Sequence, residues 1–151
     1  MPDVVIADTS CFIILSNINE LDLLLKVYGR IITTHDIVKE FGETLPEWII
    51  IKSPFDFQKQ QILELQVDKG EASAIALALE IPHSMLIVDD LQARSLAENL
   101  GISITGTIGV IIKAKLNGTI HSIKPILDKI KQTNFRLSSA VEEIALKQAG
   151  E

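Results

Sequence analysis

Short apolar runs that alternate with longer stretches of helical periodicity constrain the fold of this chain most strongly. The runs consist mainly of Ile, Val and Leu, and they occupy residues 3–7, 31–32, 48–51, 85–88 and 102–104. A strand that is apolar along its whole length is buried on both faces, as in a parallel sheet that is covered by helices. These five runs are therefore expected to be strands of such a sheet.

The segments between these runs have helical periodicity and stop at helix-breaking residues such as Gly29, Gly42, Gly70, Pro82 and Gly101. A helix is expected to start at Ser10, and others to occupy residues 21–28, 34–41, 54–67, 71–80, 91–100, 107–116, 123–131 and 138–148. In the helix over 54–67, Ile62, Leu63 and Val67 are expected to form the apolar face. Strands that alternate with helices predict the α/β class, as a three-layer α/β/α sandwich with a central, mainly parallel sheet.

The length of the chain suits one domain. Its 151 residues, of which 47% are hydrophobic, are enough for one ordinary core and too few for two. We therefore expect residues 1–151 to form a single domain. The last helices, in residues 120–151, are expected either to pack on this domain or to bind a partner.

Charge and apolar content exclude several classes of protein. The net charge of −6 and the pI of about 5.1 argue against a passive nucleic-acid binder, which would carry a basic surface. No apolar run is long enough for a membrane span, and the first residues lack the basic start of a signal peptide. The single cysteine, Cys11, cannot form a disulfide framework and is expected to be a small buried hydrophobe. The expected location is the cytoplasm, without a membrane partner.

Acidic residues follow the expected strands at the points where these strands end. Asp8 follows the first strand, and the doublet Asp89 and Asp90 follows the fourth. Glu71 begins a helix, and Glu40 lies near the end of another. Carboxyl ends of parallel strands lie at one edge of the sheet, where ligands of open α/β sheets bind. We therefore expect these carboxylates to share a cleft.

Carboxylates that converge on one cleft repel each other unless cations lie between them. Their hard oxygen atoms suit Mg²⁺ or Mn²⁺, and such ions can activate water and polarise a phosphodiester. Hydroxyl groups near the same strand ends could orient a carboxylate or hold a phosphate oxygen; they belong to Thr9, Ser10, Thr105 and Thr107. For Ser10 and Thr107, the structural alternative that they cap helices is favoured.

Each acid also has a structural alternative. Asp8 could cap a helix, Glu71 could complement a helix dipole, and Glu40 could be a solvated helix residue. Asp90 could pair with Arg94 one helical turn away, whereas a purely structural role is less expected for Asp89.

Taken in order, these motifs resemble a PIN domain, of the compact prokaryotic kind found among VapC-type toxins. The resemblance extends from Asp3 to about Gly118, and no single motif carries it alone. The matching segments are residues 4–10, 38–40, 70–76, 86–90 and 105–110, followed by Ala114, Lys115 and Gly118.

The resemblance implies a metal-dependent endoribonuclease that hydrolyses RNA phosphodiester bonds with Mg²⁺ or Mn²⁺. It implies Asp8, Glu40, Glu71 and Asp89 as the catalytic acids, with Asp90 as an alternate metal ligand beside Asp89. It also implies RNA as the substrate, an antitoxin protein as a partner, and a homodimer.

Three rival classes are compatible with parts of this pattern. A signalling receiver domain has a similar acidic strand end, but too few residues follow Asp89 here to complete that fold. A haloacid-type phosphatase needs an aspartate where Ser10 stands after Asp8. A catalytically silent binding module with the same fold is the remaining alternative, and the full set of acids argues against it.

Overall fold

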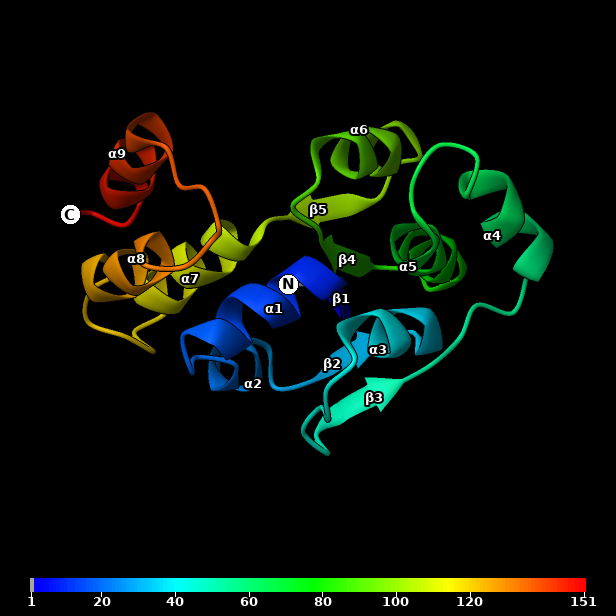
Figure 1. Ribbon diagram of the computed structural model, residues 1–151, viewed down its shortest axis with the longest axis horizontal. Helices are drawn as coiled ribbons and strands as arrows, with labels where there is room; N and C mark the ends of the chain where they lie inside the picture. Colours follow the sequence, from blue (N-terminus) through cyan, green and yellow to red (C-terminus); the bar gives the residue numbers. More distant parts are fainter. Residues whose placement is uncertain (1) are drawn as a thin grey trace.

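A computed structural model describes residues 2–151, which form a single parallel sheet with helices around it (Figure 1). The sheet order is β3-β2-β1-β4-β5, and every neighbouring pair of strands is parallel. The strands are β1 (Val4–Ala7), β2 (Ile31–Thr33), β3 (Ile49–Ile51), β4 (Ser84–Ile87) and β5 (Ser103–Thr105). The predicted α/β sandwich with a parallel sheet is confirmed.

The helices in the described residues flank this sheet. Those before β4 are α1 (Thr9–Asn17), α2 (Asp22–Tyr28), α3 (His35–Phe41), α4 (Phe57–Leu63) and α5 (Lys69–Glu80). Those after β4 are α6 (Leu91–Asn99), α7 (Thr107–Leu116), α8 (Lys124–Lys131) and α9 (Ser139–Gln148). Helix α5 contacts β1 and β4, α2 contacts β2, and α6 contacts β5.

The strand order reverses direction between β1 and β4. From β1 the chain moves outward to β2 and β3, and after β4 it moves the opposite way to β5. The register pairs Val4 with Ser84 and Ala7 with Ile87, so β1 and β4 end side by side. This switch point is where open α/β sheets bind ligands, beyond the carboxyl ends of the strands.

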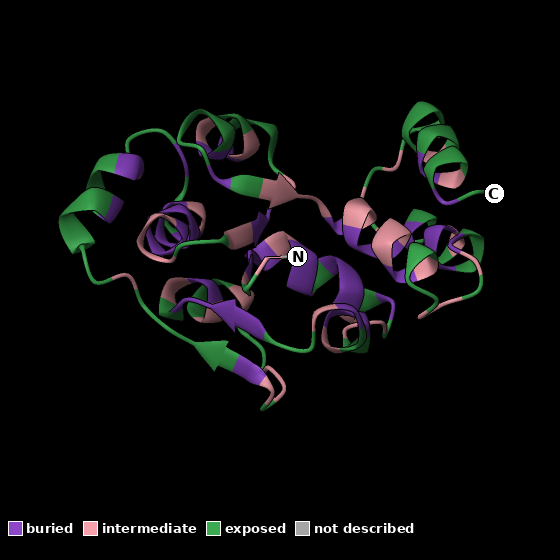
Figure 2. Cartoon of the chain, turned by 180° about the vertical axis from the view of Figure 1, so that it is seen from behind, coloured by how far each residue is buried: buried purple, intermediate pink, exposed green. Residues whose placement is uncertain are grey.

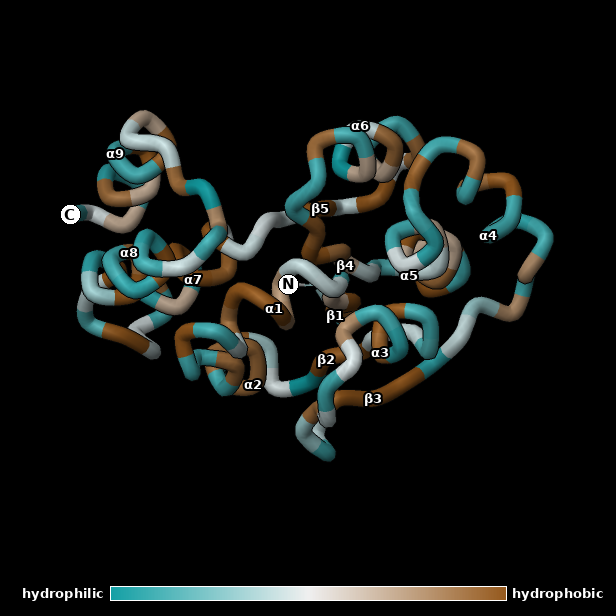
Figure 3. Tube along the Cα trace, viewed as in Figure 1, coloured by the Kyte–Doolittle hydropathy of each residue, from teal (hydrophilic) through white to brown (hydrophobic). Residues whose placement is uncertain are grey.

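The core lies along the sheet and around α1 and α5. The tube in Figure 3 is brown along β3 and over parts of the other strands, and Figure 2 shows α1 and α5 largely buried, whereas α9 is mostly exposed. In α5 every residue from Ala72 to Ala78 is buried, including Ser73. Small side chains at most of these positions let the helix lie close to its neighbours on all sides.

Two expectations about the segment before β4 are wrong. The helix expected over residues 54–67 is shortened to α4 (Phe57–Leu63), because Asp56 caps its start and a turn follows its end. Ile62, assigned to the apolar face, is 64% exposed. Gly70, expected to end a helix, lies inside α5, because Asp68 caps that helix earlier in the chain.

Helix α9 contacts α7, and α8 lies with these two helices at one end of the molecule (Figure 1). The Glu151 carboxylate accepts hydrogen bonds from the backbone N–H of Ile123 at 2.7 Å and from Ser122, and it pairs with Lys115 at 3.3 Å. These bonds tie the end of the described chain to the start of α8, and they lower the pKa of Glu151 to about 2. A partner for these helices stays a prediction. Within residues 2–151, no helix has the length and apolar character needed to cross a membrane.

The packing of α1 makes a testable prediction about stability. Phe12 is fully buried, and its ring centroid lies 5.9 Å from that of Phe41. Phe12→Ala should lower the free energy of unfolding by about 3–5 kcal/mol, because it leaves a cavity that the rigid core cannot fill. The neighbouring Ile13 is 44% exposed, so Ile13→Ala should cost less than about 1 kcal/mol. Urea denaturation measures both, and equal losses would contradict this assignment of the core.

Candidate metal centre

The Asp8 carboxylate lies at the end of the central strand and is 3% exposed. Asp8 occupies the cap position of α1, but its side chain makes no capping hydrogen bond, so the helix-capping alternative does not hold. Its Oδ1 atom is buried and has no hydrogen-bond partner among residues 2–151. A buried carboxylate oxygen without a donor costs free energy unless a ligand binds it.

Burial raises the pKa of Asp8 to about 8. A hydrogen bond from the backbone of Thr9 opposes this shift, whereas the charges of Glu71, Asp68 and Glu40 add to it. These charges show which acids lie near Asp8. The centre thus disfavours negative charge in the absence of a cation, as expected for carboxylates that converge.

Glu71 has both a structural role and a place in this acidic group. Its backbone N–H donates to Asp68 Oδ1 at 2.8 Å, and its Oε1 accepts from the backbone N–H of Asp68 at 3.3 Å. This reciprocal capping box fixes the start of α5. Burial first, and then the charge of Asp68, raise the pKa of Glu71 to about 7, with smaller contributions from Asp90 and Glu40. The sequence reasoning missed Asp68, although the spacing Asp-x-x-Glu before an apolar helix is a capping signal.

Glu40 reaches this group from the last turn of α3. Its two carboxylate oxygens lie 3.0 Å and 3.3 Å from the point that a Cβ atom at Gly70 would occupy. The missing side chain at Gly70 therefore lets the Glu40 carboxylate approach the first turn of α5. Glu40 itself is exposed, so it lies at the rim of the site.

Asp89 follows β4 by two residues and is held by hydroxyl groups from two other helices. Its Oδ2 accepts from Thr107 Oγ1 at 2.6 Å and from Ser10 Oγ at 2.9 Å, and its Oδ1 accepts from the backbone N–H of Thr107 at 2.8 Å. The favoured expectation that Ser10 and Thr107 cap helices is wrong, because Asp8 and Gly106 occupy those cap positions. The alternative, that these hydroxyls orient a carboxylate, matches the structure.

The remaining candidates have weaker contacts with the centre. Asp90 is exposed, and its Oδ2 accepts from the backbone N–H of Ala93 at 3.0 Å as the cap of α6. The alternative pairing of Asp90 with Arg94 does not form, because Arg94 donates to the backbone carbonyl of Val88 at 2.9 Å. The buried Thr9 hydroxyl has no partner among residues 2–151, and Thr105 makes only a long hydrogen bond of 3.5 Å to the carbonyl of Gly106.

The buried Cys11 thiol lies near Asp8, Asp89 and Thr107. Burial and the charge of Asp89 raise its pKa far above the ordinary value, and a hydrogen bond with Thr107 opposes this only in part. The thiol is therefore neutral and is not an activated nucleophile.

The donor set fits a hard divalent ion. In residues 2–151, no three acidic, histidine or cysteine side chains lie close enough to enclose an ion. Magnesium does not require such a cage, because it keeps several waters and binds through one or two carboxylates together with substrate phosphates. The unpaired Oδ1 of Asp8, surrounded by further carboxylates, is a donor of this kind.

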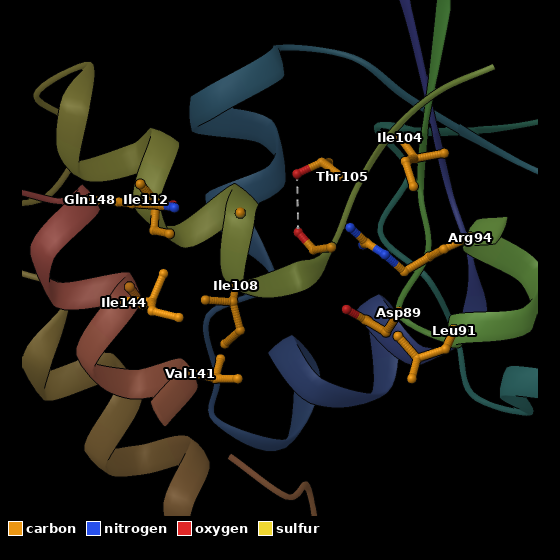
Figure 4. A pocket seen from close by; sticks show the side chains of 13 residues that line it. Asp89, Leu91, Arg94, Ile104, Thr105, Ile108, Ile112, Val141, Ile144 and Gln148 are labelled. Carbon is orange, nitrogen blue, oxygen red and sulfur yellow. Dashed lines mark hydrogen bonds between the residues drawn. The ribbon is translucent and has the colours of Figure 1, made fainter. Parts of the chain in front are cut away.

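A groove of about 470 Å³ opens beside Asp89, between the end of β5 and helices α7 and α9 (Figure 4). Asp89, Arg94 and Thr105 line its polar end, whereas Ile108 and Ile144 belong to its apolar wall. The groove gives an extended ligand access to Asp89.

The raised pKa values of Asp8 and Glu71 predict how the free energy of unfolding depends on pH in the absence of metal. Between pH 4 and pH 8 the folded state keeps a proton on Asp8 that the unfolded chain releases, so the free energy of unfolding falls as pH rises. The loss from pH 5 to pH 8, in chelator, should be on the order of 2–4 kcal/mol. Asp8→Asn should flatten this dependence, and Mg²⁺ should restore wild-type stability at pH 8.

The matched control is Asp3→Asn, the same change at the exposed opposite end of β1. It should keep the wild-type dependence on pH, measured by urea denaturation at both pH values. A metal-free wild type that becomes more stable from pH 5 to pH 8 would contradict this account of Asp8.

Comparison with known proteins bears on the family. A search of curated proteins finds no significant match. A family model described as a PIN domain matches residues 4–151, which is nearly the whole chain and includes Asp8, Glu40, Glu71, Asp89 and Asp90. The chain belongs to the PIN domain family.

Proposed function

We propose that this protein is a metal-dependent endoribonuclease that hydrolyses RNA phosphodiester bonds. Proteins of the PIN family are typically nucleases and generally bind divalent metals. The observation that carries the proposal is the buried Asp8 carboxylate, whose Oδ1 has no partner among residues 2–151 and whose pKa is raised to about 8. A fold keeps such a costly group when a cation or substrate compensates for it.

The residues proposed to bind Mg²⁺ or Mn²⁺, one or two of them directly and the others through waters of the ion, are Asp8, Glu71, Asp89 and Asp90. A bound ion there would polarise the phosphodiester and supply an activated water. The capping box fixes Glu71, and three hydrogen bonds fix Asp89, so these two carboxylates are held in place before substrate binds. Such preorganisation avoids reorganisation during the reaction.

Glu40 is proposed as the remaining catalytic acid, at the rim of the centre. Its approach over Gly70 adds negative charge close to Asp8 and Glu71, which strengthens the attraction for a cation. Thr9, Ser10, Thr105 and Thr107 are proposed to orient carboxylates or to contact phosphate. For Ser10 and Thr107 this rests on their hydrogen bonds to Asp89.

The biological setting is also part of the proposal. RNA is the substrate, and the protein acts as the toxin of a toxin–antitoxin pair with an antitoxin as partner, in the cytoplasm and as a homodimer. The alternative is a catalytically silent PIN-fold module that binds nucleic acid or protein. The unpaired Asp8 oxygen favours the enzyme, because a module that needs no ion gains nothing from that costly group.

Cleavage of unstructured and structured RNA tests the proposal. Wild-type protein should cleave with Mg²⁺ or Mn²⁺, and activity should vanish in chelator. Asp8→Asn should lower kcat by about 100-fold or more, because it removes a ligand charge from the centre. Asp3→Asn should keep wild-type activity, and circular dichroism should show that both variants are folded. Full activity of folded Asp8→Asn would reject the mechanism, and a wild type that binds RNA without cleaving it would indicate the silent module.

The two adjacent aspartates should differ in their effect. Asp89→Asn replaces an oxygen that accepts hydrogen bonds with an amide NH₂ group, so it should disturb the site and lower kcat by about 100-fold. Asp90→Asn keeps a good helix cap, so it should lower kcat by less than about 10-fold. Single-turnover cleavage at saturating RNA separates the two variants. The reverse ranking would assign the metal ligand to Asp90.

A further inference from the structure

We propose that Arg94 is the residue that binds the RNA phosphodiester beside Asp89. This inference rests on the proposed function and adds a cationic group to a site that has so far been described only by its acids. Arg94 lies on α6, and its side chain extends toward the end of the groove that Asp89 and Thr105 line (Figure 4). Among the described residues that line this groove, Arg94 alone is basic.

Because Gly106 has no side chain, the Arg94 guanidinium and the Asp89 carboxylate can both lie close to its backbone. A Cβ atom at Gly106 would lie 2.9 Å from Nη1 of Arg94 and 3.0 Å from Oδ1 of Asp89. Any side chain there would push one of these groups aside. The glycine therefore keeps a cation next to the acid that Ser10 and Thr107 hold in place.

Arg94 is anchored but not neutralised. Its Nη1 donates to the carbonyl of Val88 at 2.9 Å, and no carboxylate in residues 2–151 pairs with it. The remaining N–H groups of a guanidinium can bind a phosphate through two parallel hydrogen bonds. The chain has 20 acidic and 14 basic side chains, so an arginine beside Asp89 that pairs with no carboxylate is placed to receive an anion.

The site needs such a cation for an electrostatic reason. A chain of net charge −6 with a group of carboxylates at its centre repels RNA, and a metal ion offsets this only where it binds. A fixed guanidinium next to Asp89 would hold the phosphodiester at the groove end of the site. The carbonyl of Val88 limits the freedom of the side chain, so less entropy is lost when phosphate binds.

The competing explanation is purely structural, in which Arg94 only closes the loop at Val88. Arg94→Gln and Arg94→Lys separate the two roles. Phosphate binding predicts that Arg94→Gln lowers kcat/KM for RNA by about 10- to 100-fold. It also predicts that the plot of log kcat/KM against log salt loses about 0.7 in slope, the value for one contact with single-stranded RNA. Arg94→Lys should keep the slope and lose part of the rate, because an ammonium group cannot form the paired hydrogen bonds.

Arg30→Gln is the matched control, because Arg30 is exposed and precedes β2 at the opposite edge of the sheet. Arg30→Gln should keep the wild-type kcat/KM and the wild-type slope of log kcat/KM against log salt. Thermal stabilisation by Mg²⁺ should be unchanged in Arg94→Gln, since Arg94 is not a metal ligand. If Arg94→Gln keeps the wild-type slope, or loses the thermal stabilisation by Mg²⁺, the proposal for Arg94 is overturned. Cleavage of RNA by the wild type would still support the proposed ribonuclease in that case. A wild type that cleaves no RNA would instead reject the proposed function itself.

Discussion

The parallel pairing of β1 with β4 joins two segments that are far apart in the chain, with Ala7 opposite Ile87. Because both strands run the same way, Asp8 and Asp89 leave the sheet at the same edge and near the point where the strand order reverses. The other parts of the site are arranged around this pair of strands. Helix α5 packs on both strands, and its first turn carries Glu71 to Asp8. A shift in the register of β4 would separate these groups even if every helix stayed intact.

Asp89 and Asp8 differ in how the protein compensates the negative charge of their carboxylates. Asp89 is satisfied by three hydrogen bonds, so its position depends on the helices that carry Ser10 and Thr107. Asp8 is buried with an unpaired oxygen, and its raised pKa shows that the folded chain opposes its charge. The hydrogen bonds fix the position of the Asp89 carboxylate, whereas the unpaired oxygen of Asp8 requires a cation to compensate it. Two glycines, Gly70 and Gly106, then let charged groups approach where any side chain would obstruct them.

Much of the secondary structure could be predicted, whereas the roles of individual polar side chains could not. The apolar runs and helix stops located all five strands to within a few residues. The caps of α1 and α7, expected at Ser10 and Thr107, lie two residues and one residue earlier in the chain, at Asp8 and Gly106. With the helices starting earlier, the hydroxyls of Ser10 and Thr107 donate to Asp89 instead of capping the helix. Local propensity for capping is the same at neighbouring positions, so only the contacts between helices could decide it.

The sequence by itself determined the fold class, the family and the edge of the sheet at which the acids gather. These depend on the order of strands and helices and on the residues that follow each strand, which are local properties of the chain. The tertiary structure decided which hydroxyls hold Asp89, that Gly70 admits Glu40, and that Arg94 lies beside the acids without pairing with one. These contacts join residues that are distant in the chain. Their distances depend on how helices pack on the sheet, and the periodicity of the sequence does not encode that packing.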